Sequence, residues 1–477
     1  MFLHTPQYLL FLAVTVILYW MIPGGKARKV LLLLASYFFY VQFDFRFALL
    51  LFVLTGCVFF IGRTISISTH AKQWMWGGVI LNLAILSIFK FSNFFLASME
   101  KLGSGIDGTV FLSGLLLILP IGISFYSFQG ISYVVEIYRG KLQPNESFLD
   151  FALYMAFFPK LIAGPFVRPS LFMTELAKPQ QLPQRNIIRQ AILLLVLGLF
   201  KKIVIADSLG ALSQTAFKAA NYTSATLFPS PLYLQGFYLY AIQIYADFSG
   251  YTDLARASAM LFGFFLPENF YHPYLAGTIS EFWNRWHITL TQWFRDYLFN
   301  PLTRVLLKKT NRRYPIAIQI LVNLITMLLI GLWHGASWPF LIWGGWHGLL
   351  LSVERLFNIK PKKWWQLLYG ILTFHLIGIG WIFFNAGSVS SAIRFLVGVI
   401  SFSQMGWTAR FIWPVLLAGV LSFGLDLVML GKLFSNSRFL RNFQSVFIPL
   451  AVVIVVSLWL LSAARGGDTR PFIYGQF

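Results

Sequence analysis

The sequence contains little charge and almost no cysteine. Only 11% of its 477 residues are Asp, Glu, Lys or Arg, and its mean hydropathy is +0.71. A soluble domain usually carries about 25% charged residues, so this composition excludes an ordinary soluble protein. The single cysteine, Cys57, lies within an apolar run, and no disulfide can form within the chain.

Acidic residues are also scarce, with 16 Asp and Glu against 37 Lys and Arg and a net charge of +21. Such a charge could attract nucleic acid or another polyanion. Lys and Arg also accumulate in the cytoplasmic loops of membrane proteins. We therefore expect membrane lipids, and no nucleic acid, as partners.

Several signatures of soluble enzymes are missing from the sequence. It has no HExxH, no paired-cysteine zinc pattern, no Walker loop, no GxGxxG and no GxSxG. We expect no metal in the site.

What the sequence does contain is a series of apolar segments of suitable length for membrane spans. The first of them precedes its basic residues at 26–29, which is the reverse of a signal peptide, so we expect it to be retained. The candidate segments are 8–22, 30–43, 45–62, 74–97, 110–128, 148–166, 187–205, 232–262, 316–333, 338–353, 365–385, 411–430 and 446–462.

The charges of the loops indicate which segments cross. If all of them crossed, the basic stretch 304–313 would lie outside, against the positive-inside rule. Segment 148–166 contains Pro and Gly breakers, and we predict that it enters the membrane and returns on the same side. The chain is then one all-α polytopic domain, 1–477, with about 12 crossings and an extracytoplasmic tail, 465–477. The cytoplasmic clusters are 26–29, 63–72, 139–141, 304–313, 360–363 and 432–441.

The stretch 268–302 mixes charged and aromatic residues too finely for a span, and it predicts a helix lying along the membrane surface. Glu281 and Arg285 are four residues apart, in the order that favours an ion pair. His287 lies at the edge of the apolar face, where it could turn toward a cavity or simply pack. The apolar face comprises Ile279, Phe282, Trp283, Leu290, Trp293, Phe294 and Tyr297, and the other faces carry Glu281, Asn284, Arg285, Gln292, Arg295 and Asp296.

A second histidine, His334, ends an apolar run within GLWHGASW, where glycines permit a tight reversal. An ionisable residue in an apolar segment indicates function, and a neutral imidazole suits a general base. The triplet Trp-His-Gly recurs at His347, and residue chemistry does not choose between the two. Both could instead form hydrogen bonds between helices, and their spacing does not place both on one helical face as a metal site would require.

Polar residues in ADFSGYTD, Asp247 and Asp253 among them, interrupt another apolar region. They could orient His287 or a substrate, or they could satisfy helix ends.

Six stretches resemble the membrane-bound O-acyltransferase (MBOAT) family, in its bacterial AlgI/PatA/DltB-like branch. They are LPIGISFYSFQGISYVVEIYRG at 119–140, FFPKLIAGPFVR at 157–168, DFSGYTDLARASAMLFGF at 247–264, PENFYHPYLAGTISEFWNRWHITLTQWFRDYLFNPL at 267–302, GLWHGASWPFLIWGGWHG at 331–348 and PFIYGQF at 471–477. The resemblance implies a ring of tilted helices with re-entrant and interfacial helices around a central tunnel.

The resemblance also implies roles for individual residues. It makes His334 the catalytic histidine and His287 its partner across the tunnel, and it gives His347 no catalytic role. Supporting residues are expected at Trp283, Arg285, Trp286, Trp333, Asp247, Asp253, Arg295 and Asp296. In this branch Tyr474, within the tail motif of Phe472, Tyr474 and Phe477, would carry the acyl group, although a terminal aromatic cluster could also anchor the chain at the membrane surface.

The expected function is therefore an inner-membrane O-acetyltransferase of a bacterium. It would move an acetyl group from cytoplasmic acetyl-CoA toward an extracellular or cell-wall polysaccharide, with an extracytoplasmic SGNH-type partner. A transporter or flippase would be expected to show repeated halves, which the sequence does not display. Acylation of a lipid or a protein, as in other MBOAT branches, fits this resemblance less well.

Overall fold

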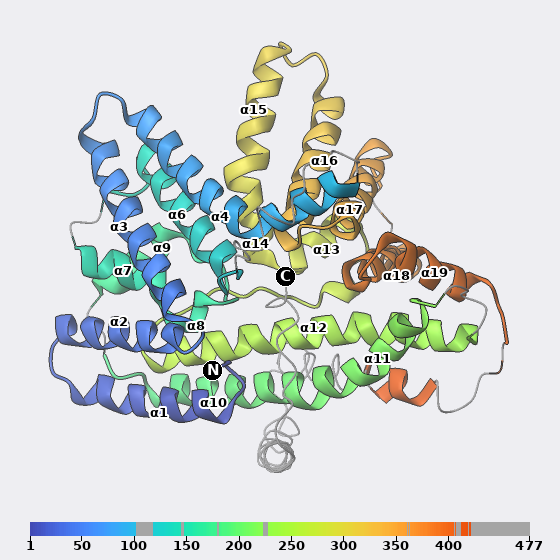
Figure 1. Ribbon diagram of the computed structural model, residues 1–477, viewed down its shortest axis with the longest axis horizontal. Coiled ribbons are helices and arrows are strands. Elements are labelled where there is room, and N and C mark those ends of the chain that lie inside the picture. Colours follow the sequence, from blue (N-terminus) through green and yellow to red (C-terminus); the bar gives the residue numbers. More distant parts are fainter. Residues whose placement is uncertain are drawn as a thin grey trace. The chain divides into compact units, whose positions relative to one another are not determined.

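The apolar runs of the sequence fold into helices. The computed structural model describes residues 1–101, 118–144, 147–178, 181–222, 228–359, 361, 363–404, 406, 412–417 and 419–420, and every regular element within these ranges is a helix (Figure 1). Some of the predicted segments lie wholly or largely outside the described residues. They are 411–430, 446–462, the first part of 110–128, and the tail with Tyr474. The helical interpretation of the remaining segments is confirmed.

The described chain divides into two compact units. The first comprises residues 1–191 and 255–267. Its core includes α6, in which every residue from Ile123 to Ile137 is buried, packed against α3 and α4. Its helices are α1 (Pro6–Met21), α2 (Gly25–Val41), α3 (Phe45–Ile67), α4 (Ala71–Lys101), α6 (Ile123–Tyr138), α7 (Phe148–Ala156), α8 (Phe158–Leu161) and α9 (Pro169–Ala177).

The segment with the predicted re-entrant course is broken in the middle. Helix α7 ends at Ala156 and the short α8 begins at Phe158, with Pro159 in its first turn. The buried ammonium of Lys160 donates to the carbonyl of Tyr154 at 2.6 Å. A break of this kind is compatible with a segment that turns back, and its course through a membrane stays a prediction.

The second unit comprises residues 192–254 and 268–477. Its best-packed pair is α16 and α17, which approach so closely that a Cβ at Gly331 would lie 2.3 Å from the carbonyl oxygen of Phe340. Helices α10 and α12 contribute residues to both units. The elements are α10 (Arg185–Leu199), the π-helical turn η1 (Phe200–Ala206), α11 (Asp207–Ala219), α12 (Ser230–Leu261), η3 (Pro273–Leu275), α13 (Ile279–Arg285), α14 (Ile288–Phe294), the π-helical turn η4 (Arg295–Phe299), α15 (Asn300–Lys309), α16 (Pro315–His334), α17 (Trp338–Leu356), η5 (Lys363–Trp365), α18 (Gln366–Asn385) and α19 (Val389–Ile400).

Four helices in the described ranges are long and apolar enough to cross a membrane: α3, α4 over Ala71–Ser92, α16 and α18. Large apolar side chains also point outward, among them Phe60 at 67% exposure and Leu367 at 78%. Exposure of such a surface to water is unfavourable, whereas contact with lipid tails is not. The chain is an all-α polytopic membrane protein, and the total of about 12 crossings stays a prediction.

Candidate active site

The segment around His287 is two short helices rather than one. Helix α13 ends at Arg285, and α14 begins after His287, whose φ of 42° lies in the left-handed region. The prediction of one continuous surface helix is therefore wrong. Most of its apolar face is nevertheless buried, because Phe282, Trp283 and Leu290 are each at most 4% exposed.

The break arises from a tertiary contact, which a helical wheel drawn from one segment cannot show. The carbonyl of Asn269 accepts from the N–H of Ile288 at 2.9 Å. The side-chain oxygen of Asn269 accepts from both the N–H and the hydroxyl of Thr289, at 3.3 and 2.5 Å. The first N–H groups of a helix need such acceptors, so Asn269 determines where α14 starts.

His287 is a buried, neutral imidazole. Its Nδ1 lies 3.4 Å from the side-chain oxygen of Asn269, which already accepts from Thr289, so Nδ1 donates and the lone pair is on Nε2. Burial lowers the pKa of His287 from 6.5 to about 3, because a buried site disfavours the charged form. Its ring packs against Phe248 and Trp333, with centroids 4.6 and 6.2 Å away.

His334 is the last residue of α16 and is 4% exposed. Gly335 follows it in an extended conformation, and a Cβ there would lie 2.1 Å from the ring of Phe340. Only glycine fits this turn, after which α17 begins at Trp338. The predicted helix end and reversal at GLWHG are confirmed.

Aromatic rings surround His334 and connect it to the other histidines. Trp333, Trp343 and Phe384 have centroids 4.8, 5.1 and 5.2 Å from its ring. Trp333 also contacts His287, and Trp343 also contacts His347 at 4.9 Å. The structure thus brings both predicted histidines, and the recurring one, into a single aromatic cluster.

The predicted supporting residues lie in several places. Trp286 is buried in the cluster against Trp381, at 4.8 Å. Arg285 forms the predicted ion pair with Glu281. Arg295 donates to the side chain of Asn284 at 2.6 Å, and Asp296 is half-buried in η4.

The structure contains a network of buried charges that the sequence did not lead us to predict. Lys202, on the π-helical turn η1, contacts Asp247 and Asp207, each at 2.9 Å, and Lys201 contacts Asp253 at 3.1 Å. Asp247 and Lys202 are 1% and 4% exposed. Two adjacent lysines inside an apolar run were the available signal, because buried cations need acidic partners.

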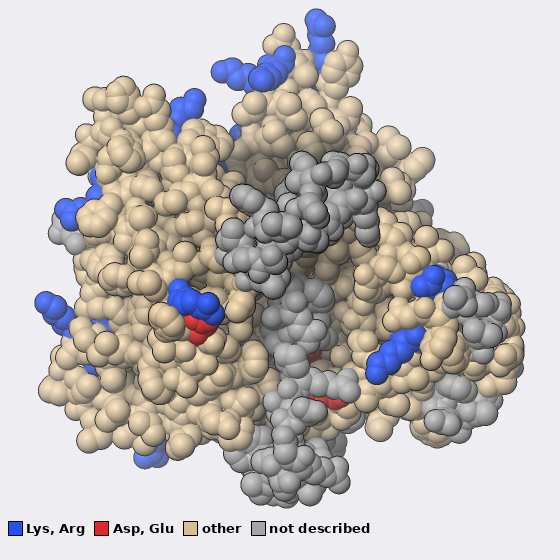
Figure 2. Space-filling model, in the orientation of Figure 1, with Lys and Arg blue, Asp and Glu red and all other residues tan. Residues whose placement is uncertain are grey.

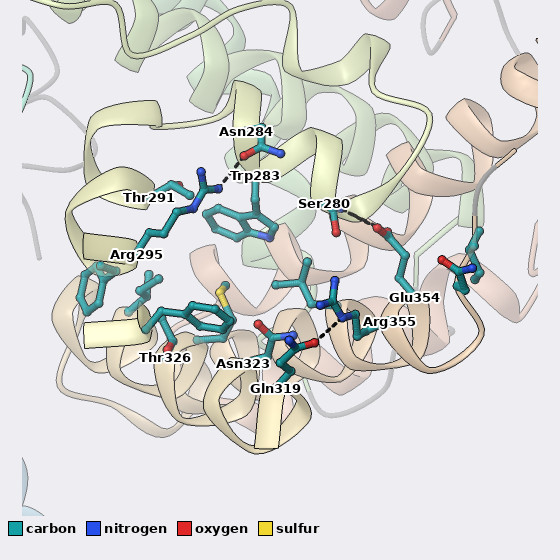
Figure 3. A pocket seen from close by; sticks show the side chains of 17 residues that line it. Ser280, Trp283, Asn284, Thr291, Arg295, Gln319, Asn323, Thr326, Glu354 and Arg355 are labelled. Carbon is teal, nitrogen blue, oxygen red and sulfur yellow. Dashed lines mark hydrogen bonds between the residues drawn. The ribbon is translucent and has the colours of Figure 1, made fainter. Parts of the chain in front are cut away.

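A cavity of about 390 Å³ lies between α13 and the α16–α17 pair (Figure 3). On α16 its lining runs from Gln319 to Ile330, which corresponds to about 16 Å of helix. His334 follows one turn later. Polar groups that line it include Trp283, Asn284, Arg295, Asn323, Glu354 and Arg355.

The site therefore combines a neutral buried imidazole, a second histidine at a helix break and a cavity that ends near it. Among the described residues, no three His, Cys, Asp or Glu side chains are grouped as metal ligands would be. These features define a multi-pass membrane protein with an enzyme-like site.

Comparison with known proteins narrows this class. The sequence pattern of the MBOAT, membrane-bound O-acyltransferase family, matches residues 144–359, which include His287 and His334. The chain is 37% identical to "Probable alginate O-acetylase AlgI" of Pseudomonas aeruginosa, over 82% of this chain and 73% of that one. It is 33% identical to "Peptidoglycan O-acetyltransferase" of Helicobacter pylori, over 78% and 73%, and 29% identical to "Teichoic acid D-alanyltransferase" of Streptococcus thermophilus, over 56% and 68%. The chain belongs to the membrane-bound O-acyltransferase family and is an O-acyltransferase, as the resemblance predicted.

Proposed function

We propose that this chain is an O-acetyltransferase of the bacterial inner membrane, with acetyl-CoA as donor and a hydroxyl of an extracellular or cell-wall polysaccharide as final acceptor. The names of two relatives, an alginate O-acetylase and a peptidoglycan O-acetyltransferase, support the acetyl group and the polysaccharide. The observation that carries the proposal is the buried His334, one helical turn beyond Ile330, the last residue of α16 that lines the cavity.

The donor enters from the cytoplasmic side. Lys and Arg side chains gather at the end of the α15–α16 hairpin (Figure 2), and the positive-inside rule assigns this end to the cytoplasm. They are Arg304, Lys308, Lys309, Arg312 and Arg313, all exposed. Such a group attracts the phosphates of coenzyme A, while the cavity along α16 accommodates the extended thioester arm.

His334 acts as the general base. As the oxygen of the acceptor attacks the thioester carbonyl, His334 takes the hydroxyl proton, a C–O bond forms and the C–S bond breaks. His334 then returns the proton to the leaving sulfur. The last carbonyls of α16 favour the positive charge that the imidazole carries in between.

His287 assists from the other side of Trp333. Its Nε2 lone pair can accept a hydrogen bond, which orients the acceptor hydroxyl before attack. The immediate acceptor is the phenol of Tyr474, from which an extracytoplasmic SGNH-type enzyme passes the acetyl group to the polysaccharide.

Labelled acetyl-CoA tests the relay. After incubation with the purified chain, mass spectrometry should find the label on Tyr474, and neither Tyr474→Phe nor His334→Ala should carry it. His287→Ala should slow the labelling without moving it. An unlabelled Tyr474 in the wild type, or undiminished label in His334→Ala, would overturn the proposed route.

A bulky residue in the cavity tests the donor path. Asn323 lines the cavity, so Asn323→Phe should raise the KM for acetyl-CoA at least tenfold. Leu321 is on the same helix but is 48% exposed and does not line the cavity, so Leu321→Phe is the matched control. Equal KM values for the two variants would contradict the path.

A further inference from the structure

Three buried indole nitrogens in the aromatic cluster have no hydrogen-bond partner within the described part of the chain. They belong to Trp283, Trp343 and Trp381, which are 4%, 0% and 1% exposed. An indole N–H can only donate, and a buried donor without an acceptor destabilises a fold. Phenylalanine would fill these positions without that cost, so the N–H groups call for a functional explanation.

Two of these indoles lie beside the reaction centre. The ring of Trp343 is 5.1 Å from that of His334 and nearly perpendicular to it. Trp283 lines the cavity, into which its indole reaches in Figure 3, and its ring is 5.8 Å from that of Trp343. Trp283 therefore connects the cavity to Trp343, and Trp343 contacts the ring of His334.

We propose that the indole N–H groups of Trp343 and Trp283 stabilise the oxyanion of acyl transfer, an inference that rests on the proposed function. When the acceptor oxygen bonds to the carbonyl carbon, the carbonyl π electrons move onto its oxygen. The hydroxyl proton goes to His334, and the two N–H groups bind the new anion. Collapse restores the carbonyl and expels the sulfur, which takes the proton from His334.

The apolar surroundings make these donors effective. Donors that are fixed before the reaction, in a site without water, stabilise developing charge more strongly than donors in water do. Phe384 and Phe282 add further apolar rings around the two indoles. A polar acceptor arriving with the substrate completes the hydrogen bonding that the described protein groups leave open.

His347 is the positioning residue for both indoles. Its fully buried ring lies 5.2 Å from Trp283 and 4.9 Å from Trp343. A Cβ at Gly380 would lie 2.5 Å from its Nε2, so only a glycine on α18 leaves room for the ring. His347 thus fixes the angle between the two donors, which gives the second Trp-His-Gly triplet a role.

Phenylalanine substitutions in the purified full-length chain test the donors. Trp343→Phe and Trp283→Phe keep an aromatic ring but remove the N–H. Each should lower kcat by about 100-fold and leave the KM for acetyl-CoA within about twofold. Trp381 carries an equally buried N–H, but its ring packs tilted against Trp286, and it is neither part of the cavity lining nor one of the three rings named above around His334. Trp381→Phe should therefore keep nearly full kcat.

The outcomes separate the two levels of the proposal. The oxyanion assignment would be overturned if Trp343→Phe and Trp283→Phe kept kcat within threefold of the wild type. It would also be overturned if Trp381→Phe lowered kcat as much as they do. If His334→Ala remained active, the proposed function itself would fail. Should Trp343→Phe not fold, as judged by its melting curve, Trp283→Phe decides alone.

A double-mutant cycle tests the positioning role. His347→Phe should lower kcat without changing the KM. In the Trp343→Phe background the same change should have little further effect, because the donor it orients is already absent. Independent, multiplicative losses would show that His347 acts otherwise.

Discussion

Gly344 is the position at which one added methyl group should disturb the active site most directly. It faces α16, where a Cβ would lie 2.4 Å from the carbonyl oxygen of Met327 and 3.1 Å from the Cα of Leu328. Ordinary contacts of a Cβ begin at 3.4 Å. The obstacle is backbone, which cannot rotate aside, so Gly344→Ala must separate α16 and α17 locally by about 1 Å.

The magnitude of the effect follows from this separation. Overpacking of this kind costs about 1–3 kcal/mol of stability. Met327 lies two helical turns before His334, so the shift should extend to the ring of His334, the proposed general base. A misplacement of about 1 Å can lower a rate by about 100-fold, and we expect a loss of that order in acetyl transfer.

The neighbouring glycine provides the control. A Cβ at Gly345 would lie 3.7 Å from the side chain of Leu328, which is an ordinary contact. Alanine is also favoured over glycine within a helix by about 1 kcal/mol, so Gly345→Ala should be fully active and melt no lower than the wild type. Melting curves in detergent and transfer of labelled acetyl groups measure both effects, and equal behaviour of the two variants would refute the packing argument.

Three further perturbations have defined outcomes. Asp247→Ala leaves the buried Lys202 with one of its two described aspartates, and it should lower the free energy of chemical unfolding by about 3 kcal/mol. Asp253→Ala should cost less, because its pair with Lys201 is more exposed. Asn269→Ala removes the cap of α14 and should cost about 1–2 kcal/mol by the same measurement, with reduced transfer activity. His287 stays neutral in the folded chain down to about pH 3 but binds a proton below pH 6.5 when unfolded, so stability should fall as pH falls from 6.5, by about 1 kcal/mol at pH 5.5. The melting temperature of His287→Gln should depend less on pH across that window; an unchanged dependence would contradict the buried neutral imidazole.

Much of the fold could be predicted because it depends on local hydropathy. The run before His334 is largely apolar, with Gln319 and Asn323 among its few polar residues, and it forms α16 from Pro315 with an error of one residue at either end. The turn at Gly335 was also predictable, since a glycine directly after an apolar run indicates a helix end. Helix α19 was not anticipated, because its polar first turn, including Ser390 and Ser391, makes it shorter and less apolar than a span.

The candidate site was predictable only in part. His287 and His334 could be selected as residue types in unusual surroundings, but their common contact with Trp333 joins segments nearly fifty residues apart. The break before α14 depends on Asn269, and the pairing of Lys202 with Asp247 depends on the approach of α12 to η1. Such contacts arise from tertiary packing, which no single segment encodes.

The aromatic cluster around the three histidines has a consequence for the membrane itself. In the proposed function the cavity opens on one face of the bilayer, which would shorten the path along which ions could leak. Trp286, Trp343 and Trp381 are each at most 1% exposed and pack ring against ring beyond the cavity lining. An ion entering such a layer would lose its hydration without gaining a charged partner, at a cost of several kcal/mol. If the chain works as proposed, the rings around the histidines would also act as electrical insulation, so that an acyl group could be transferred inside the bilayer while the proton gradient across it is maintained.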